Sequence, residues 1–155
     1  MAPPQTSGPR RRAREHALQI LFSLDVNSTL TRPQALAAFW RDFARAGDET
    51  VVDETDVPAE VVTYTEQLVN GATDNLAEID AIVQKASRNW RLERMGRVDR
   101  NVLRLATYEL RFEPEVPAKV VINEAIEVAR RFGAAESPAF VNGLLDKIAQ
   151  EMKRT

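Results

Sequence analysis

The residues best suited to chemistry form an arginine cluster near the N-terminus. Residues 10–14 read RRRAR, which supplies Arg10, Arg11, Arg12 and Arg14. Guanidinium groups are planar, permanently charged donors that suit phosphate oxygens. These arginines precede and open a predicted helix, at the end where the helix dipole disfavours positive charge, so an external anion would explain their placement. The cluster therefore predicts a nucleic-acid contact, while a solvated charge run and a contact with the acidic residues 47–57 remain open alternatives.

Three further side chains could extend a nucleotide-binding surface. Gln19 and Phe22 follow the arginines by about one and two helical turns, and an amide can read a base edge while a ring can stack on a base. For Phe22 taken alone, core packing is the favoured interpretation. Phe140 stands in the first turn of the last predicted helix, four residues before Leu144. Base stacking and packing against the Phe132–Gly133 corner are both open for it.

The net charge of −2 conceals a strong asymmetry along the chain. Residues 42–60 are acidic, with Arg45 their single arginine. Residues 88–104 carry a second arginine group, opposed by Glu93 and Asp99: Arg88, Arg91, Arg94, Arg97, Arg100 and Arg104. Trp90 lies inside this group and is predicted to be a packing residue. The distribution indicates an oriented electrostatic surface.

Enzymatic and metal-binding sites are disfavoured by the residues that the sequence lacks. The chain has no cysteine and one histidine, His16, which we expect at the surface or at a boundary of the first helix without a catalytic role. The scattered glycines form no phosphate-binding loop. Glu124 and Glu127 share a helix face but have no histidine three residues on, so we predict a solvated face. We expect no catalytic residue, cofactor or metal.

Composition and periodicity predict an all-α protein. The 155 residues are 44% hydrophobic and 28% charged, which is ordinary for a globular domain. No apolar run reaches the length of a membrane span, and the N-terminal residues do not resemble a secretory signal, so we expect a cytoplasmic protein. Apolar residues recur with helical spacing, and strand-like character is confined to Val120–Ile122, which entry into the following helix explains equally well. Helices are predicted at residues 10–26, 31–46, 58–90 (one helix or two, with Gly71 as a break), 98–110, 122–132 and 137–152.

Capping residues and composition divide the chain further. Thr31 and Ser137 are predicted N-caps, each followed by a proline in the first turn, and Gly133 is predicted to end a helix. Gly143, inside the last helix, indicates a close approach by another backbone or a ligand. We therefore expect a flexible tail at residues 1–9 and a single helical domain at 10–155. The domain would hold about six or seven helices in two bundles, with subdomains at about 10–89 and 97–155.

Three segments of the chain resemble the NusB family. They read RRRAREHALQILF, RMGRVDRNVLRLATYEL and PAKVVINEAIEVARRFGAAESPAFVNGLLDKIA. The resemblance implies two three-helix bundles and a non-catalytic role in transcription antitermination with NusA, NusG and NusE, a ribosomal protein of the small subunit. It further implies binding, together with NusE, to single-stranded boxA RNA of ribosomal RNA operons.

The resemblance also implies site residues. The RNA-facing residues would be Arg10, Arg11, Arg12, Arg14, Gln19, Phe22 and Phe140. Glu136 retains the charge of an aspartate in relatives, whereas Pro138 and Ala139 replace residues that can be polar or basic, which would remove one RNA contact. For the NusE-facing surface, Phe22 and the helices of the first half are the candidates.

Two other functions remain open from the sequence. One is an RNA-binding accessory domain like that of some RNA methyltransferases, although the chain has no glycine-rich cofactor turn and we expect no catalytic half. The other is a helical protein-interaction module that does not bind RNA. The sequence also leaves open whether the free protein is a monomer or a homodimer.

Overall fold

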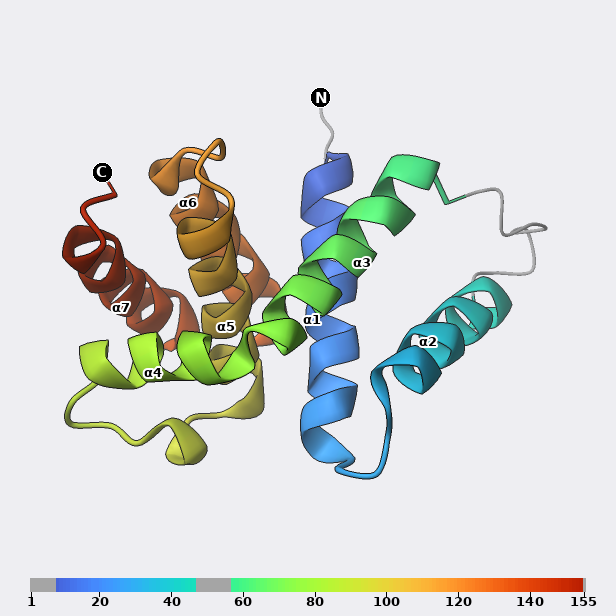
Figure 1. The fold of residues 1–155 in the computed structure, drawn as a ribbon, viewed down its shortest axis with the longest axis horizontal. Helices are drawn as coiled ribbons and strands as arrows, with labels where there is room; N and C mark the ends of the chain where they lie inside the picture. The colour runs from blue at the N-terminus through green and yellow to red at the C-terminus, as the bar shows by residue number, and fades with distance from the viewer. Residues whose placement is uncertain (1–7, 47–56, 155) are drawn as a thin grey trace. The chain divides into compact units, whose positions relative to one another are not determined.

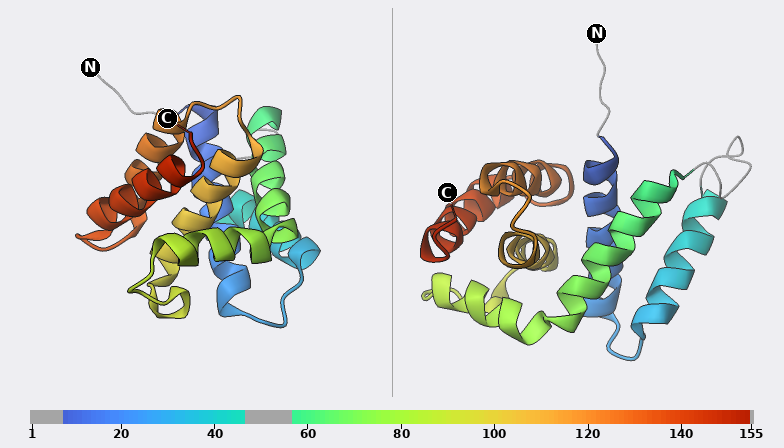
Figure 2. Two further views of the ribbon diagram at one scale, coloured as in Figure 1. Left: turned by 60° about the vertical axis from the view of Figure 1, so that its left-hand side comes forward. Right: turned by 45° about the horizontal axis from the view of Figure 1, so that its top comes forward.

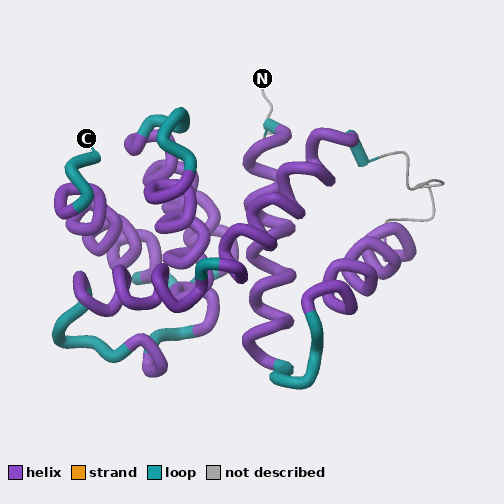
Figure 3. Tube along the Cα trace, viewed as in Figure 1, coloured by secondary structure: helices purple, strands orange, loops and turns teal. Residues whose placement is uncertain are grey.

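The computed structural model describes residues 8–46 and 57–154, and its regular elements in these ranges are all helical (Figures 1 and 3). The predicted all-α class is confirmed. The predicted tail and acidic loop lie mostly at residues 1–7 and 47–56, outside the described residues. The elements are α1 (Pro9–Val26), α2 (Arg32–Ala46), α3 (Ala59–Asp74), α4 (Leu76–Ala86), the 3-10 helix η2 (Leu92–Arg94), α5 (Arg97–Phe112), α6 (Ala118–Phe132) and α7 (Ser137–Glu151).

The first of two compact units extends to Asn70 and contains α1, α2 and most of α3. The ring of His16 on α1 lies 5.2 Å from that of Phe39 and 5.9 Å from that of Trp40, both on α2. The indole Nε1 of Trp40 donates a hydrogen bond to Glu66 on α3 at 3.2 Å. Aromatic packing and polar contacts, among them a hydrogen bond from Arg32 to the Asn70 carbonyl at 3.3 Å, thus connect the three helices. Their buried apolar residues include Ala13, Ala17, Leu18, Ile20, Leu21, Ala35, Val61, Leu68 and Val69.

Thr31 caps α2 as predicted. Its hydroxyl accepts a hydrogen bond from the backbone N–H of Gln34 at 3.3 Å, and the Gln34 side chain accepts one from the backbone N–H of Thr31 at 3.0 Å. This reciprocal capping box satisfies two N–H groups that have no partner within the helix.

The second unit begins at Gly71 and is centred on α5. α5 packs against α4, α6 and α7, and α6 and α7 lie side by side (Figure 2). Leu103 and Leu110 of α5 are almost completely buried. The guanidinium of Arg104 bonds both carboxylate oxygens of Asp80 on α4, at 2.8 and 2.9 Å. A paired, hydrogen-bonded charge can be tolerated in such a partly buried position.

The division of the chain differs from the expected seam near residues 90–97. α4 belongs to the second unit because it packs against α5 and α7, which gives that unit four complete α-helices instead of the three expected. The helical break also falls at Asn75 and not at Gly71. Gly71 is required for another reason: a methyl group there would overlap the ring of Tyr108 on α5.

The α6–α7 corner confirms one predicted end and corrects one predicted cap. α6 ends at Phe132, with Gly133 following, and Val120–Ile122 is helical. Ser137, however, is the first helical residue of α7, and its hydroxyl accepts a hydrogen bond from the Ala134 N–H at 2.9 Å. Gly133 has no left-handed backbone; a Cβ there would come within 2.6 Å of the Ser137 hydroxyl. Close packing at the corner therefore explains this glycine.

Among the helices in the described ranges, none is both long and apolar enough to cross a membrane.

Candidate nucleic-acid interface

The four N-terminal arginines lie on two different sides of α1. At 100° per residue, Arg11, Arg12, Gln19 and Phe22 fall within a sector about 100° wide, whereas Arg10 and Arg14 lie outside this sector. Arg10 is exposed, and Arg11 and Arg12 are partly exposed. The cluster that reads as one unit in the sequence is thus divided by the helical geometry.

Arg10 and Arg14 both face a buried aromatic ring of α3. The guanidinium carbon of Arg10 is 4.0 Å from the ring centre of Tyr64, and that of Arg14 is 5.9 Å from it. Only 6% of Arg14 is exposed, so it is not part of a solvated charge run. Stacking on Tyr64 gives this pair a structural role, through a cation–π contact that stabilises the charge near the start of the helix. Tyr64 is not among the residues predicted from the sequence, because nothing local to it indicates the pairing.

Gln19 and Phe22 are exposed on the second half of α1. Phe22 retains 38% of its surface, so its interpretation as a core residue is wrong. Exposed Ser23 and Val26 continue this side toward the end of the helix. An accessible amide and an accessible ring lie here within one helical turn of each other.

Buried residues separate these two side chains from the arginines. Glu15 and His16 lie between them on the same side of α1, and His16 is covered by the rings of α2. The expectation of a surface or boundary histidine is therefore wrong. Burial, together with the positive charge of Arg12, lowers the pKa of His16 to about 4, so the imidazole is neutral at physiological pH. This side of α1 therefore carries two separate accessible patches. Arg11 and Arg12 form a basic patch, and Gln19 and Phe22 form a patch whose amide and ring are suited to contacting bases.

A hollow of about 340 Å³ opens beside Gln19, between α1 and α2. Its apolar wall comes from Leu30, Ala35, Ala38 and Phe39, and its polar groups from Gln19, Ser23 and Asp42. A hollow with apolar walls and a few polar groups suits a flat, partly polar ring. The Asp42 carboxylate disfavours a phosphate in this position.

Phe140 belongs to the second unit. It lies in the first turns of α7, where its backbone N–H bonds the Glu136 carbonyl at 3.1 Å, and it is partly exposed. The ring is thus neither fully buried nor fully free, which is consistent with both roles predicted for it. At Gly143, no described atom other than those of its two neighbours and of its own helical backbone lies within 4 Å of the position that a Cβ would occupy. The expected approach of another backbone within this chain is therefore wrong, and an external ligand stays a prediction.

The structure also places Glu127 and Trp90, two other residues singled out from the sequence. In the part of the chain that the structure describes, no three histidine, cysteine or acidic residues are grouped to hold a metal ion. Glu127 is exposed and pairs with Arg130 at 3.6 Å. Trp90 is 53% exposed, so its prediction as a packing residue is wrong.

Comparison with known proteins assigns the family. The NusB family model matches residues 11–150. The transcription antitermination protein NusB of Sorangium cellulosum is 46% identical over 147 residues, covering 95% of this chain and 96% of the relative. The NusB of Myxococcus xanthus is 44% identical, covering 95% of this chain and 99% of the relative.

Solved structures agree with this assignment. Thermotoga maritima NusB superimposes with a TM-score of 0.78 at 37% identity, over 97% of this chain and 94% of that one. A crystal structure of the antitermination factors NusB and NusE with double-stranded RNA has the same fold, with a TM-score of 0.76 at 23% identity. That match covers 94% of this chain and 99% of the other. The chain belongs to the NusB family of transcription antitermination proteins, which are not enzymes.

Proposed function

We propose that this protein binds boxA-type single-stranded RNA together with NusE during transcription antitermination, notably on ribosomal RNA. The observation that carries the proposal is the side of α1 on which Arg11, Arg12, Gln19 and Phe22 are accessible. Arginines supply phosphate contacts that position a strand, whereas an amide and an exposed ring contact bases. These two patches on one helix support a contact with several consecutive nucleotides.

The other predicted RNA residues take different parts in the proposal. Phe140 stacks on a base through its accessible part. Arg10 remains exposed beside Tyr64 and adds to the positive potential, while Arg14 acts mainly by supporting the start of α1. The hollow beside Gln19 accommodates one base whose edge the amide can bond.

The proposal extends to partners. The relative solved with NusE and RNA supports a joint RNA complex, in which this chain supplies one part of the surface and NusE the other. NusA and NusG would join it in the transcription elongation complex, in the cytoplasm. Curated relatives of nearly the same length are antitermination proteins, and no observation favours the methyltransferase-accessory or RNA-free alternatives.

The test is an RNA titration at several salt concentrations, with boxA-like and scrambled sequences. Replacing Arg10, Arg11, Arg12 and Arg14 by alanine should weaken binding and reduce the log–log salt slope by about 0.7 for each phosphate that the protein no longer neutralises. Arg41→Ala is the matched control, because its side chain is 60% exposed on α2 and bonds its neighbour Asp42. An unchanged slope in the quadruple variant would refute binding through α1.

A further inference from the structure

The second arginine group, at residues 88–104, is not used by the proposed boxA surface, and the structure divides it into two kinds. Arg100 is 8% exposed and donates a hydrogen bond to the Leu92 carbonyl at 3.2 Å, while Arg104 bonds Asp80. These two arginines hold the fold together. The exposed members are Arg88, Arg91, Arg94 and Arg97, all in or next to the connection between α4 and α5, and we call residues 88–97 the arginine loop.

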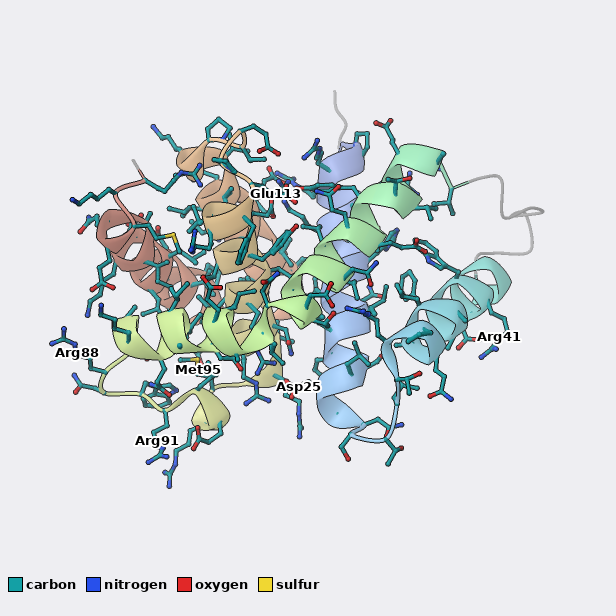
Figure 4. All side chains as sticks on the ribbon, viewed as in Figure 1. Asp25, Arg41, Arg88, Arg91, Met95 and Glu113 are labelled. Atoms are coloured by element: carbon teal, nitrogen blue, oxygen red, sulfur yellow. The ribbon has the colours of Figure 1, made fainter. Side chains whose placement is uncertain are left out.

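Trp90 stands among these exposed arginines with 53% of its surface accessible. Tryptophan is usually largely buried, so an indole exposed to this degree is informative. In Figure 4, Arg88 and Arg91, the basic residues on either side of it in sequence, point away from the helices of the second unit. The arginine loop thus combines a large flat ring with a surplus of positive charge.

The backbone of the arginine loop is fixed by hydrogen bonds. The Gln84 side chain donates to the carbonyls of Ser87 and Trp90 at 3.0 and 3.1 Å and accepts from the Leu92 N–H at 2.8 Å. The Ser87 hydroxyl also donates to the Trp90 carbonyl, at 2.9 Å. Met95, near the other end, is 5% exposed and anchors the loop. Because both ends are held, the exposure of the indole is a built feature of the loop.

Most of the positive charge in the arginine loop is available to a ligand. Arg91 pairs with Glu93 at 3.1 Å. The pKa of Glu93 is lowered by a backbone hydrogen bond and by the charge of Arg91, with a smaller contribution from the charge of Arg94, so this carboxylate stays ionised. Across the described residues, no hydrogen bond or ion pair holds the side chains of Arg88, Arg94 or Arg97. Three guanidinium groups therefore remain for an anion.

We infer that the arginine loop is a second contact surface for single-stranded RNA, on which a base stacks against Trp90 while Arg88, Arg94 and Arg97 contact phosphates. Aromatic rings beside basic side chains are the usual composition of sequence-tolerant single-strand surfaces. Guanidinium forks match phosphate oxygens, and an acidic peptide would use the charge but leave the indole face without a stacking partner. Because neither contact reads a base edge, the surface would hold RNA outside the specifically recognised element. The inference depends on the proposed function only in taking RNA as the ligand.

The first experiment follows the fluorescence of Trp90 in a Trp40→Phe background, where it is the single remaining tryptophan. Titration with an unstructured oligouridylate at low salt should quench this fluorescence to saturation, because a stacked base covers the indole. In the otherwise unchanged chain, Trp90→Ala should weaken binding of the same RNA by about 5- to 150-fold. Leu76→Ala, another exposed apolar residue of the second unit, is the control and should leave RNA affinity unchanged.

The arginines are tested through salt dependence. The triple variant Arg88→Ala, Arg94→Ala, Arg97→Ala should reduce the log–log salt slope by about 2, or about 0.7 for each arginine. Arg41→Ala should not change it. Because all replaced residues are exposed, melting temperatures should remain close to that of the parent, and this measurement verifies folding.

The outcomes separate this inference from the proposed function. RNA binding that depends on the α1 arginines but neither quenches Trp90 nor changes in the triple variant would overturn the second surface and leave the proposed function intact. Absence of any RNA binding would overturn both. Quenching of Trp90 fluorescence by oligoglutamate but not by RNA would assign the arginine loop to an acidic protein partner. Self-association that Trp90→Ala abolishes, with unchanged RNA affinity, would assign the loop to contact with a second copy of this chain. Either result would overturn the inference.

Discussion

At the scale of single residues, buried His16 makes the stability of the fold depend on pH. Its pKa is lowered from 6.5 to about 4, so the unfolded chain takes up this proton first as the pH falls. The stability from the neutral imidazole is complete above about pH 6.5 and is lost progressively toward pH 4. We predict that this residue alone lowers the free energy of unfolding by about 2 kcal/mol between pH 8 and pH 5.

The measurement is chemical denaturation across that pH range, compared with His16→Leu. The variant retains the apolar packing against Phe39 and Trp40 but has no imidazole to titrate. As the pH falls, the free energy of unfolding of the variant should decrease less steeply than that of the parent, because both proteins share the same carboxylates and only the parent has the imidazole. Identical pH slopes for both proteins would contradict the neutral, buried histidine.

Phe140 is the residue for which packing and RNA binding make opposite predictions. If its accessible part stacks on a base, Phe140→Ala should cost about 1–3 kcal/mol of RNA binding. Because the ring is partly exposed, the loss of stability should stay below the roughly 3–5 kcal/mol of a fully buried ring. Phe112→Ala, which removes another partly exposed ring, serves as control and should affect stability alone. Intact RNA affinity together with a large loss of stability would defeat the stacking role.

At the scale of elements, α1 has one side that supports the fold and one that we assign to RNA. Arg10→Ala and Arg14→Ala should each lower the free energy of unfolding by about 1 kcal/mol, because each removes a guanidinium from the ring of Tyr64. Arg11→Ala and Arg12→Ala should lower stability less and should each reduce the RNA salt slope by about 0.7. A double-mutant cycle with Tyr64→Leu measures the first effect. Equal behaviour of all four arginines would contradict the division of α1 into two sides.

Two helical glycines should respond in opposite directions to the same substitution. Glycine inside a helix normally costs about 1 kcal/mol relative to alanine. Gly143→Ala should therefore raise the melting temperature, since no described atom would contact the new methyl group. Gly71→Ala should lower it, because the methyl group would overlap the ring of Tyr108 and such overpacking costs about 1–3 kcal/mol. A higher melting temperature of Gly71→Ala would show that the end of α3 does not pack on α5 as described. Reduced RNA affinity of Gly143→Ala would show that RNA approaches α7 closely at Gly143.

The elements differ in how far the sequence predicts them. α1, α2 and α5 to α7 follow from apolar periodicity, and the start of α2 follows from Thr31 and Pro33, because these signals are local. The α3–α4 break does not follow, since Gly71 is present for contact with Tyr108 and not to end a helix. In the site, the types of Gln19 and the arginines indicated RNA, but the structural role of Arg10 and Arg14 depends on Tyr64, far along the chain. The burial of His16 and the exposure of Trp90 likewise depend on partners that no local pattern specifies.

At the scale of the whole molecule, we expect this protein to form one part of a composite RNA surface. A short basic patch such as Arg11 and Arg12 offers few phosphate contacts, so it should bind single-stranded RNA weakly at physiological salt. A partner that continues the surface makes the second contact intramolecular, which raises its effective concentration. Specific binding should therefore require both proteins, although each contributes a modest share of the free energy.

The most direct measurement is the affinity of a labelled boxA-like RNA for this protein with and without NusE, by fluorescence anisotropy at physiological salt. We predict that NusE tightens binding by at least about tenfold, a coupling of roughly 1.4 kcal/mol. A scrambled RNA of the same length should gain much less, because its bases do not match the specific contacts. Equal affinity for the boxA-like RNA with and without NusE, or an equal gain for the scrambled RNA, would contradict joint recognition.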